Sequence, residues 1–171
     1  GLGDVYKRQV EAGLPACMWP FAGPCYCFLE SIAFDESRGA SPYALHTGNE
    51  FDGMSLPFGC GVYFKPAPTK YTPSKAAPRM QYGIFLGYKL APGGIWSGEY
   101  IVADLDDFVG KDFSVDADAK KWFTQPHSTK VVRVDSGGIV YPLKAKYQRV
   151  NYTLEGREEA YALYDPTLLG A

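Results

Sequence analysis

The sequence predicts an α+β fold, in which an N-terminal helical segment precedes a small antiparallel β-barrel that carries a long acidic insert. A change in the hydrophobic pattern predicts this order. Apolar residues recur every three or four positions from Glu11 to about Phe34, and from Leu56 onward the period becomes two. The insert shows as a run of seven acids and one base between Glu99 and Asp118, which interrupts the succession of short strands.

The helical segment carries apolar residues on one face, namely Trp19, Ala22, Tyr26, Leu29 and Ala33. Pro20 and Pro24 fall inside it, and each lacks a backbone N–H and crowds the preceding turn. We therefore expect a kink or two shorter helices. Ser41-Pro42 then predicts an N-cap and the first position of a short helix, which runs to about Thr47 and ends at Gly48.

The barrel begins with a short predicted strand at Gly61 to Phe64 and a proline-rich loop at Pro66 to Pro78. The clearest strand follows, with one face formed by Met80, Tyr82, Ile84, Leu86, Tyr88 and Leu90. Gly83 and Gly87 on its other face predict a bulge, a bend or a close backbone approach. The remaining predicted elements are strands at Gly98 to Leu105, Ser128 to Val134 and Ile139 to Leu143, and a terminal helix at Glu155 to Leu163.

Composition favours one globular domain and excludes several other classes of protein. The chain has 171 residues, of which 46% are hydrophobic and 21% charged, which is typical of a folded chain and not of a disordered one. No apolar run approaches the length of a membrane span, and a signal peptide is absent, so we expect a cytoplasmic or nuclear protein without a membrane partner. The four cysteines predict reduced thiols, and Cys25-x-Cys27 lacks zinc-ligand spacing, so no metal site is expected.

The first nine residues have a possible origin outside the natural protein. Asp4 to Gln9 can be encoded by GAT GTG TAT AAG AGA CAG, which resembles the transposon-end adaptor of sequencing libraries. We therefore expect residues 1–9 to be a translated adaptor remnant, natural sequence to begin near Val10, and the parent protein to extend upstream. The alternative is an ordinary polar N-terminal tail.

Charge is segregated along the chain although the net charge is only −2. Five bases and no acids lie between Leu56 and Gly98, namely Lys65, Lys70, Lys75, Arg79 and Lys89. Bases interleaved with aromatic residues can neutralise phosphates while Tyr71, Tyr82 and Tyr88 offer faces for stacking on nucleic-acid bases. Tyr88 and Trp96 are the candidates either to stack on the ligand or to pack in the protein. The alternative is that the lysines only solvate loops around a small barrel, because a net-acidic chain lacks the usual basic footprint.

Several short motifs follow one another in a family-specific order. They are Ala12-Gly13-Leu14-Pro15 with Trp19 and Ala22 after it, Ser41-Pro42-Tyr43-Ala44-Leu45-His46-Thr47-Gly48, Leu56-Pro57-Phe58-Gly59-Cys60-Gly61-Val62-Tyr63, and Gly83-Ile84-Phe85-Leu86-Gly87-Tyr88. In this order they resemble the C-terminal part of the integrase in the Pol polyprotein of copia-type LTR retrotransposons. The amino-acid sequences of Trp19 to Ala22 and of Gly93 to Tyr100 are similar to those of a retroelement variant abundant in dinoflagellates. Ala44 replaces the usual glutamate, and the insert after Tyr100 departs from the family's short hairpin.

The resemblance implies a domain order of core end (10–55), SH3-like barrel (56–150) and C-terminal tail (151–171). It also implies that the parent integrase holds two divalent ions, magnesium or manganese, on three carboxylates. This chain lacks that motif: Glu11 has the wrong context, and Asp104, Asp106 and Asp107 lack calcium-loop spacing and are expected in a solvated turn. We therefore expect a chain without a cofactor that is not an enzyme by itself.

Three functions stay open at this point. The first is an accessory domain in DNA integration that binds retroelement ends or target DNA, or other integrase subunits, with Lys65, Lys70, Lys75, Arg79 and Lys89 on phosphates. The second is a protein–protein interaction module with Asp104 to Asp118 as its docking surface. The third is a decayed retroelement reading frame with no function.

Overall fold

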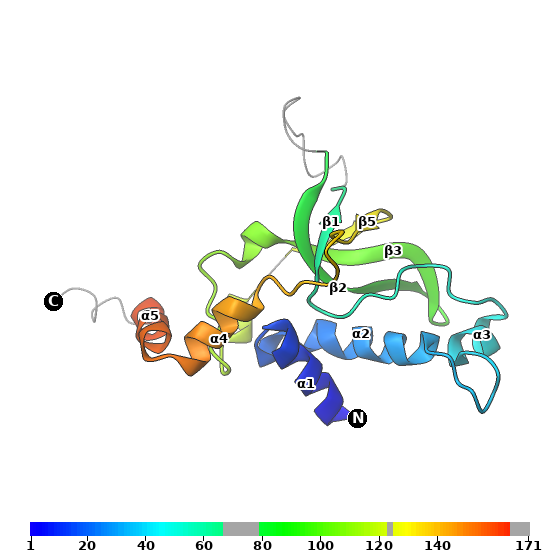
Figure 1. Cartoon of the computed structure of the whole chain (residues 1–171), viewed down its shortest axis with the longest axis horizontal. Coiled ribbons are helices and arrows are strands. Elements are labelled where there is room, and N and C mark those ends of the chain that lie inside the picture. Colours follow the sequence, from blue (N-terminus) through cyan, green and yellow to red (C-terminus); the bar gives the residue numbers. More distant parts are fainter. Residues whose placement is uncertain (67–78, 123–124, 165–171) are drawn as a thin grey trace.

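The computed structural model describes residues 1–66, 79–122 and 125–164. Its fold is α+β, and its antiparallel sheet of five strands is curled into a half-barrel in the order β4-β3-β2-β1-β5 (Figure 1). The strands are β1 (Gly61–Phe64), β2 (Gln81–Ala91), β3 (Ile95–Asp104), β4 (His127–Thr129) and β5 (Val132–Arg133). The prediction of an α+β chain with an antiparallel sheet is thus confirmed.

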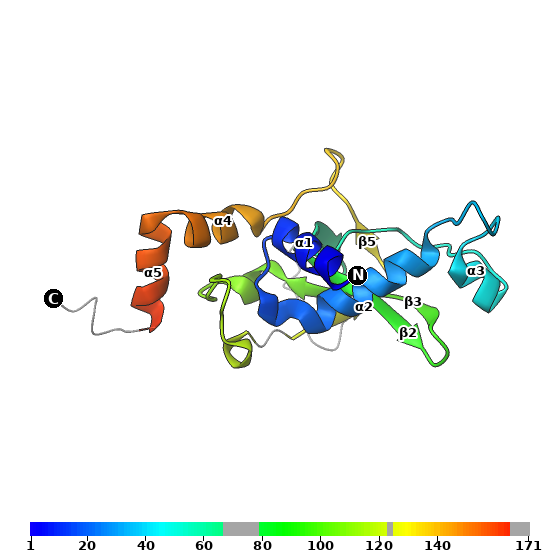
Figure 2. The same ribbon diagram turned by 90° about the horizontal axis from the view of Figure 1, so that it is seen from below.

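The helices lie along the sheet and at both ends of the molecule. They are α1 (Leu2–Ala12), α2 (Trp19–Ile32), α3 (Pro42–Thr47), α4 (Lys144–Tyr152) and α5 (Leu154–Tyr164), with short 3-10 turns η1 (Ala16–Met18), η2 (Leu105–Phe108) and η3 (Ala119–Lys121). Helix α2 packs along β2, and α3 and α5 occupy opposite ends of the molecule (Figures 1 and 2). None of the helices described combines the length and apolar character needed to cross a membrane.

The N-terminal helical segment is interrupted upstream of the prolines, whereas Pro20 and Pro24, where the break was predicted, both lie within the single helix α2. The chain leaves α1 at Gly13, which has a φ of 74°, and α2 starts at Trp19 with Pro20 in its first turn. The predicted apolar face is wrong in part. Trp19 is 38% exposed, and the buried side chains of α2 are those of Ala22, Cys25 and Phe28.

Residues 1–9 form most of α1 and take part in the core. Val5 and Gln9 are buried, and the Gln9 side-chain amide donates to the carbonyl oxygen of Pro15. The adaptor interpretation of these residues stays a prediction. Whatever their origin, they contribute a packed helix to this chain.

Helix α3 follows the predicted caps. The Ser41 hydroxyl accepts a hydrogen bond from the Ala44 amide at 3.1 Å, Pro42 occupies the first turn, and Gly48 ends the helix with a φ of 81°. Serine at the N-cap and glycine past the C-terminus satisfy backbone groups that the helix itself leaves unpaired. The local sequence therefore specifies both ends of this element.

Strand β2 confirms the predicted central strand, but its simple alternation of faces is wrong. The register with β3 shifts between Phe85 and Gly87, so a bulge at Leu86 reverses the phase, and residues 83–88 are all buried. The close approach predicted for glycine is present at Gly83. A Cβ there would lie 2.3 Å from the carbonyl oxygen of Ala103 and 2.7 Å from the ring of Phe64.

The single strand predicted at Ser128 to Val134 is two strands on opposite edges of the sheet. β4 pairs with β3, whereas β5 pairs with β1. The Thr129 hydroxyl donates to the carbonyl oxygen of Lys65 at 3.0 Å and so brings the two edges together. A short segment can reach both edges only if the sheet between them curls, which accounts for the half-barrel.

The prediction of a strand at Ile139 to Leu143 is wrong. Ile139 and Val140 are 45% and 47% exposed, and the carbonyl oxygen of Val140 accepts one hydrogen bond from the Gly61 amide at 2.8 Å. This segment passes beside Gly61 at the start of β1 and leads into α4, a helix that the sequence pattern did not predict. The predicted terminal helix is present as α5.

Candidate nucleic-acid interface

The structure does not bring the sequence-predicted bases into one patch. Lys65 follows β1 and Arg79 precedes β2, so both lie at one end of the sheet, whereas Lys89 lies at the other end of β2. Eight residues of strand separate Gln81 from Lys89, which is about 27 Å at the usual rise. The Lys89 ammonium also lies 3.1 Å from the Glu99 carboxylate. Lys70 and Lys75 lie outside the described residues.

Tyr88 and Trp96, the aromatic residues predicted to stack or pack, both pack within the protein. Tyr88 is only 7% exposed, and burial raises the pKa of its hydroxyl, which therefore stays neutral. Trp96 is half-buried: its indole N–H donates to the carbonyl oxygen of Glu99 at 2.9 Å, and its ring lies 4.9 Å from that of Phe51. Of the two roles left open, packing fits their placement.

Tyr82, which the sequence also predicts as a stacking residue, pairs with Tyr63 on the outer side of β1 and β2, while Tyr71 lies outside the described residues. Tyr63 is directly opposite Tyr82 across the two strands, and their ring centroids are 4.9 Å apart with a 55° tilt. On the other side of β1, Arg133 is the direct partner of Tyr63. Residues directly opposite in antiparallel strands point to the same face. Tyr63 is 39% exposed and Arg133 is exposed, so this face is open to solvent.

Further cations border these tyrosines. Lys65 is two residues beyond Tyr63 and so lies on the same side of the chain, and the bond from Thr129 to its carbonyl oxygen places Lys130 beside it. Arg79 is exposed and lies three residues before Tyr82, at the same end of the sheet as Lys65. We define the tyrosine face as these two tyrosines with the bases at this end of the sheet, namely Tyr63, Tyr82, Lys65, Arg79, Lys130 and Arg133. All four of its cations are exposed.

The cations of the tyrosine face differ from several other cations of the chain in their ion pairing. Within residues 1–66, 79–122 and 125–164, none of its four cations forms a salt bridge with a carboxylate. Elsewhere Arg8, Arg38, Lys89 and Arg149 do so. Cations without an internal partner keep their charge available for an external anion, which favours a phosphate-binding role.

One acid lies near this face. The pKa of Tyr82 is raised, first by burial and then by the neighbouring Tyr63 hydroxyl and the Asp135 carboxylate. Asp135 belongs to the turn after β5, where its carboxylate accepts the Gly137 amide at 3.4 Å. The Tyr82 phenol therefore stays protonated at neutral pH.

The acidic insert is folded and not a solvated loop. Phe108, Phe113 and Trp122 are buried. The ring centroids of Phe113 and Trp122 are 5.0 Å apart. The prediction of a solvated turn is wrong for Asp104, which is 7% exposed and caps η2 by accepting the Asp106 amide at 3.1 Å. In the part of the chain that the structure describes, no group of three or more His, Cys, Asp or Glu side chains could hold a metal ion.

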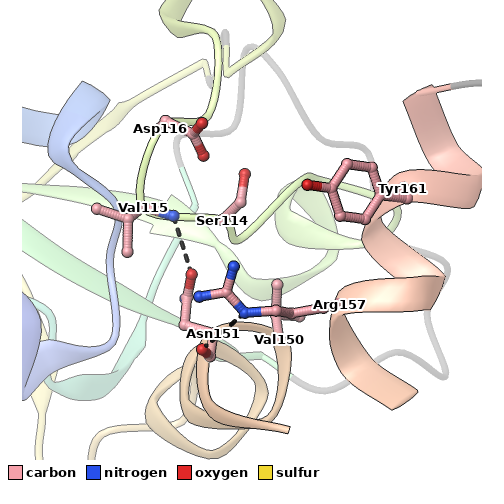
Figure 3. A pocket seen from close by; sticks show the side chains of 7 residues that line it. All are labelled: Ser114, Val115, Asp116, Val150, Asn151, Arg157 and Tyr161. Carbon is pink, nitrogen blue, oxygen red and sulfur yellow. Dashed lines mark hydrogen bonds between the residues drawn. The ribbon is translucent and has the colours of Figure 1, made fainter. Parts of the chain in front are cut away.

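A cavity of about 160 Å³ lies between the insert and helices α4 and α5 (Figure 3). It is lined by Ser114, Val115, Asp116, Val150, Asn151, Arg157 and Tyr161. Arg157 and Asp116 bring opposite charges to it, and Arg157 Nε donates to the Asn151 carbonyl oxygen at 3.1 Å. Because the charges of the lining oppose each other, the cavity does not select a class of ligand.

Asn151 anchors the insert to α4. Its side-chain nitrogen donates to the carbonyl oxygens of Phe113 and Tyr147, both at 2.8 Å. Its side-chain oxygen accepts the Val115 amide at 3.0 Å (Figure 3). The residue is 5% exposed. Its match to a glycosylation acceptor, Asn151-Tyr152-Thr153, is therefore incidental in the folded chain, because the amide nitrogen is already engaged.

We expect Asn151→Ala to lower the free energy of unfolding by about 2 kcal/mol, because the Phe113 carbonyl and the Val115 amide lose their partner. Chemical denaturation followed by tryptophan fluorescence measures this change, with Trp122 in the insert as one of the reporters. The exposed Asn49, replaced in the same way, serves as the control and should change stability by less than about 0.5 kcal/mol. Equal effects of the two substitutions would contradict the anchoring role.

Sequence reasoning missed Tyr63, Lys130 and Arg133 as parts of one surface. The signal was present only in part: Tyr63 alternates with buried residues in β1, but its pairing with Arg133 depends on the position of β5. No protein-family model, curated protein or solved structure matches this chain.

Proposed function

We propose that this chain is an accessory nucleic-acid-binding domain of a copia-type retrotransposon integrase, not catalytic by itself, whose curled sheet is an SH3-like barrel. The tyrosine face is the observation that carries this proposal. It combines two partly exposed aromatic rings with four cations that have no carboxylate partner among the described residues. The motif resemblance supports the family, and the register of β1 with β2 and β5 supports the surface.

The expected binding energy comes mainly from the phosphate backbone. Each phosphate that a lysine or arginine neutralises releases a condensed counterion, so affinity falls steeply with salt. Lys65, Arg79, Lys130 and Arg133 could neutralise four phosphates, which gives a slope of log K against log salt of about −3 to −4. The net charge of −2 makes long-range attraction weak, so binding depends on this local cluster.

A titration of the chain with labelled DNA at several salt concentrations tests the proposal. We expect the affinity to fall by about 50- to 150-fold between about 50 and 200 mM salt. The triple substitution of Lys65, Lys130 and Arg133 by serine should remove most of the binding and flatten the slope to about −1, because about one phosphate contact remains. Fluorescence anisotropy provides both quantities.

Two single substitutions serve as controls for this titration. Arg38→Ser removes a charge far along the chain, next to Asp35, and should leave the affinity unchanged. Lys89→Ser tests a base that belongs to the sequence-predicted set but not to the tyrosine face, since Lys89 is paired with Glu99 at the other end of β2. Binding that is absent at low salt, or that falls equally with Arg38→Ser and with the triple variant, would contradict the proposal.

A protein–protein interaction module is the second candidate, and the acidic insert supplies the observation that favours it. Val109 is 77% exposed, and the carboxylates of Asp106, Asp116 and Asp118 also lie at the surface of the insert. An apolar side chain among exposed acids suits a basic protein partner. Loss of DNA binding from the titration above would leave this candidate as the better one.

A further inference from the structure

We infer that the tyrosine face takes unpaired bases, so that its ligand is a single-stranded segment of nucleic acid and not an intact duplex. This inference rests on the proposed function and adds the class of ligand. It depends on how the rings of Tyr63 and Tyr82 lie on the sheet.

The ring of Tyr82 lies across β1 and does not project from the surface. A Cβ built on Gly61 would be 1.9 Å from the Tyr82 hydroxyl oxygen and 2.6 Å from its ring carbon, and 2.9 Å from Pro142. The hydroxyl end of Tyr82 therefore lies in the space that a side chain at position 61 would fill, between β1 and the segment that leads to α4. The ring is held along the sheet by its neighbours, so its orientation is fixed before a ligand arrives.

Tyr63 continues this aromatic surface into solvent. Its ring is tilted by 55° from that of Tyr82 and is 39% exposed. Because the two strands fix both Cα positions, the pair forms a small rigid platform with little side-chain freedom to lose on binding. Rings held in this way suit stacking on the flat face of a base, which is a contact that every base can make.

A duplex does not offer the same contact. Its base faces are covered by the neighbouring base pairs, and only base edges are accessible in the grooves. An aromatic side chain reaches a base face in a duplex only by entering a base step as a wedge, which requires it to project and to kink the DNA. Tyr82 is held against Gly61 and Pro142, so it does not provide such a wedge.

The cations are placed to follow a strand past the platform. Arg133 is directly opposite Tyr63 on one side, and Lys65 is two residues further along β1, which is about 7 Å at the usual rise. Basic side chains that flank aromatic platforms are the usual arrangement for sequence-tolerant binding of single strands. The tyrosine face has both components within three neighbouring strands.

Three probes test the inference with the full chain: an oligo-dT of about 12 nucleotides, a duplex of equal length, and a backbone of equal length with abasic sites in place of the bases. At about 50 mM salt we expect the oligo-dT to bind at least about 10-fold more tightly than the abasic backbone or the duplex. The abasic backbone carries the same phosphates, so this difference reports contacts with bases.

Substitutions at Tyr63 identify the source of the difference. Tyr63→Ala should weaken oligo-dT binding by about 10-fold and leave binding to the abasic backbone unchanged, whereas Tyr63→Phe should bind like the parent chain because the ring remains. Thermal unfolding of each variant shows that the fold persists, and Tyr63 is exposed enough for substitution to be tolerated.

The outcomes distinguish this inference from the proposed function. Equal affinity for duplex and oligo-dT, with neither affinity lowered by Tyr63→Ala, would overturn the single-strand inference. The proposed function would still stand in that case if binding depended on salt. Salt-dependent binding of none of the three probes would overturn both. Preference for the oligo-dT that Tyr63→Ala does not reduce would place base contacts elsewhere on the chain and overturn the assignment to the tyrosine face.

Discussion

Replacing Tyr88 by alanine is expected to lower the free energy of unfolding by about 4 kcal/mol, which is near the upper range for an aromatic residue in a core. The ring of Tyr88 lies within 4.5 to 6.4 Å of five other rings, namely those of Phe28, Phe51, Phe85, Trp96 and Tyr100. Its removal leaves a cavity where α2, the segment before β1 and the β2–β3 hairpin meet.

The hydroxyl of Tyr88 contributes separately. It accepts the Leu56 amide at 2.9 Å and donates to the carbonyl oxygen of Met54 at 2.7 Å, while the Tyr100 hydroxyl accepts the Met54 amide at 2.9 Å. Tyr88→Phe keeps the ring and removes only the two bonds of the Tyr88 hydroxyl, to Leu56 and to Met54, so we expect a smaller loss of about 2 kcal/mol. These bonds fix residues 54–56 at the entrance to β1.

Thermal and urea unfolding measure both variants. A loss of about 4 kcal/mol corresponds to a fall of roughly 8 to 16 °C in Tm for a chain of this size. Tyr152→Ala is the matched control, because Tyr152 is 70% exposed and should change stability by less than about 0.5 kcal/mol. A stability of Tyr88→Ala equal to that of the control would show that this aromatic cluster does not hold α2 against the sheet.

Gly13→Ala is expected to be the second most destabilising substitution, with a loss of about 3 kcal/mol. Gly13 ends α1 with a φ of 74°, which costs an alanine about 1 kcal/mol. A Cβ at this position would also lie 2.4 Å from the Cα and 2.6 Å from the amide nitrogen of Lys144. Both are backbone atoms at the start of α4, so neither helix can relieve the overlap by a change of side-chain rotamer.

Gly39→Ala provides the control that separates the two causes. Gly39 has a φ of 69°, close to that of Gly13, but a Cβ there would have no heavy atom within 4 Å. Gly39→Ala should therefore show the cost of the backbone conformation alone, about 1 kcal/mol. The expected difference of about 2 kcal/mol between the two variants, measured by urea unfolding, reports the contact of α1 with α4. Equal losses would mean that this contact is absent in solution.

The elements that the sequence predicts well have local signals at their ends. Helix α3 has Ser41 and Pro42 at its start and Gly48 after its end, and all three act in the structure as their chemistry predicts. Strand β2 has a long alternating pattern, and Gly83 is a glycine because another backbone passes too close for a side chain. In each case the physical requirement lies within a few residues of the signal.

The elements that the sequence does not predict depend on distant partners. The segment from Ser128 to Val134 reads as one strand, because nothing within it shows that its two halves pair with different edges. Helix α4 has no side-chain cap, and its buried residues include Asn151, whose partners lie in the insert. Its place is set by packing against α1 and the insert, which a local pattern does not contain.

At the candidate site, too, local features could be predicted from the sequence and features that depend on distant pairing could not. Lys65 and Arg79, two of the bases that the sequence offers, are exposed near the tyrosine face, but a sequence pattern does not rank tyrosines by exposure. Tyr82 and Tyr88 fall on the same predicted face of one strand, and the bulge at Leu86 leaves one half-exposed and buries the other. The sequence offers Tyr82 and Tyr88 alike as stacking residues, because that shift of phase was not predicted, and it does not single out Tyr63.

The division of residues 128–134 between two edges also has a kinetic consequence. Both β1 and β3 keep an unpaired edge until this one segment arrives, and the bond between Thr129 and Lys65 joins positions 64 apart in sequence. Contacts of such long separation form slowly, since a large loop must close before they contribute stability. We therefore expect both edges to be open to pairing with other chains until residues 128–134 dock, so that docking of this segment also closes a route to aggregation.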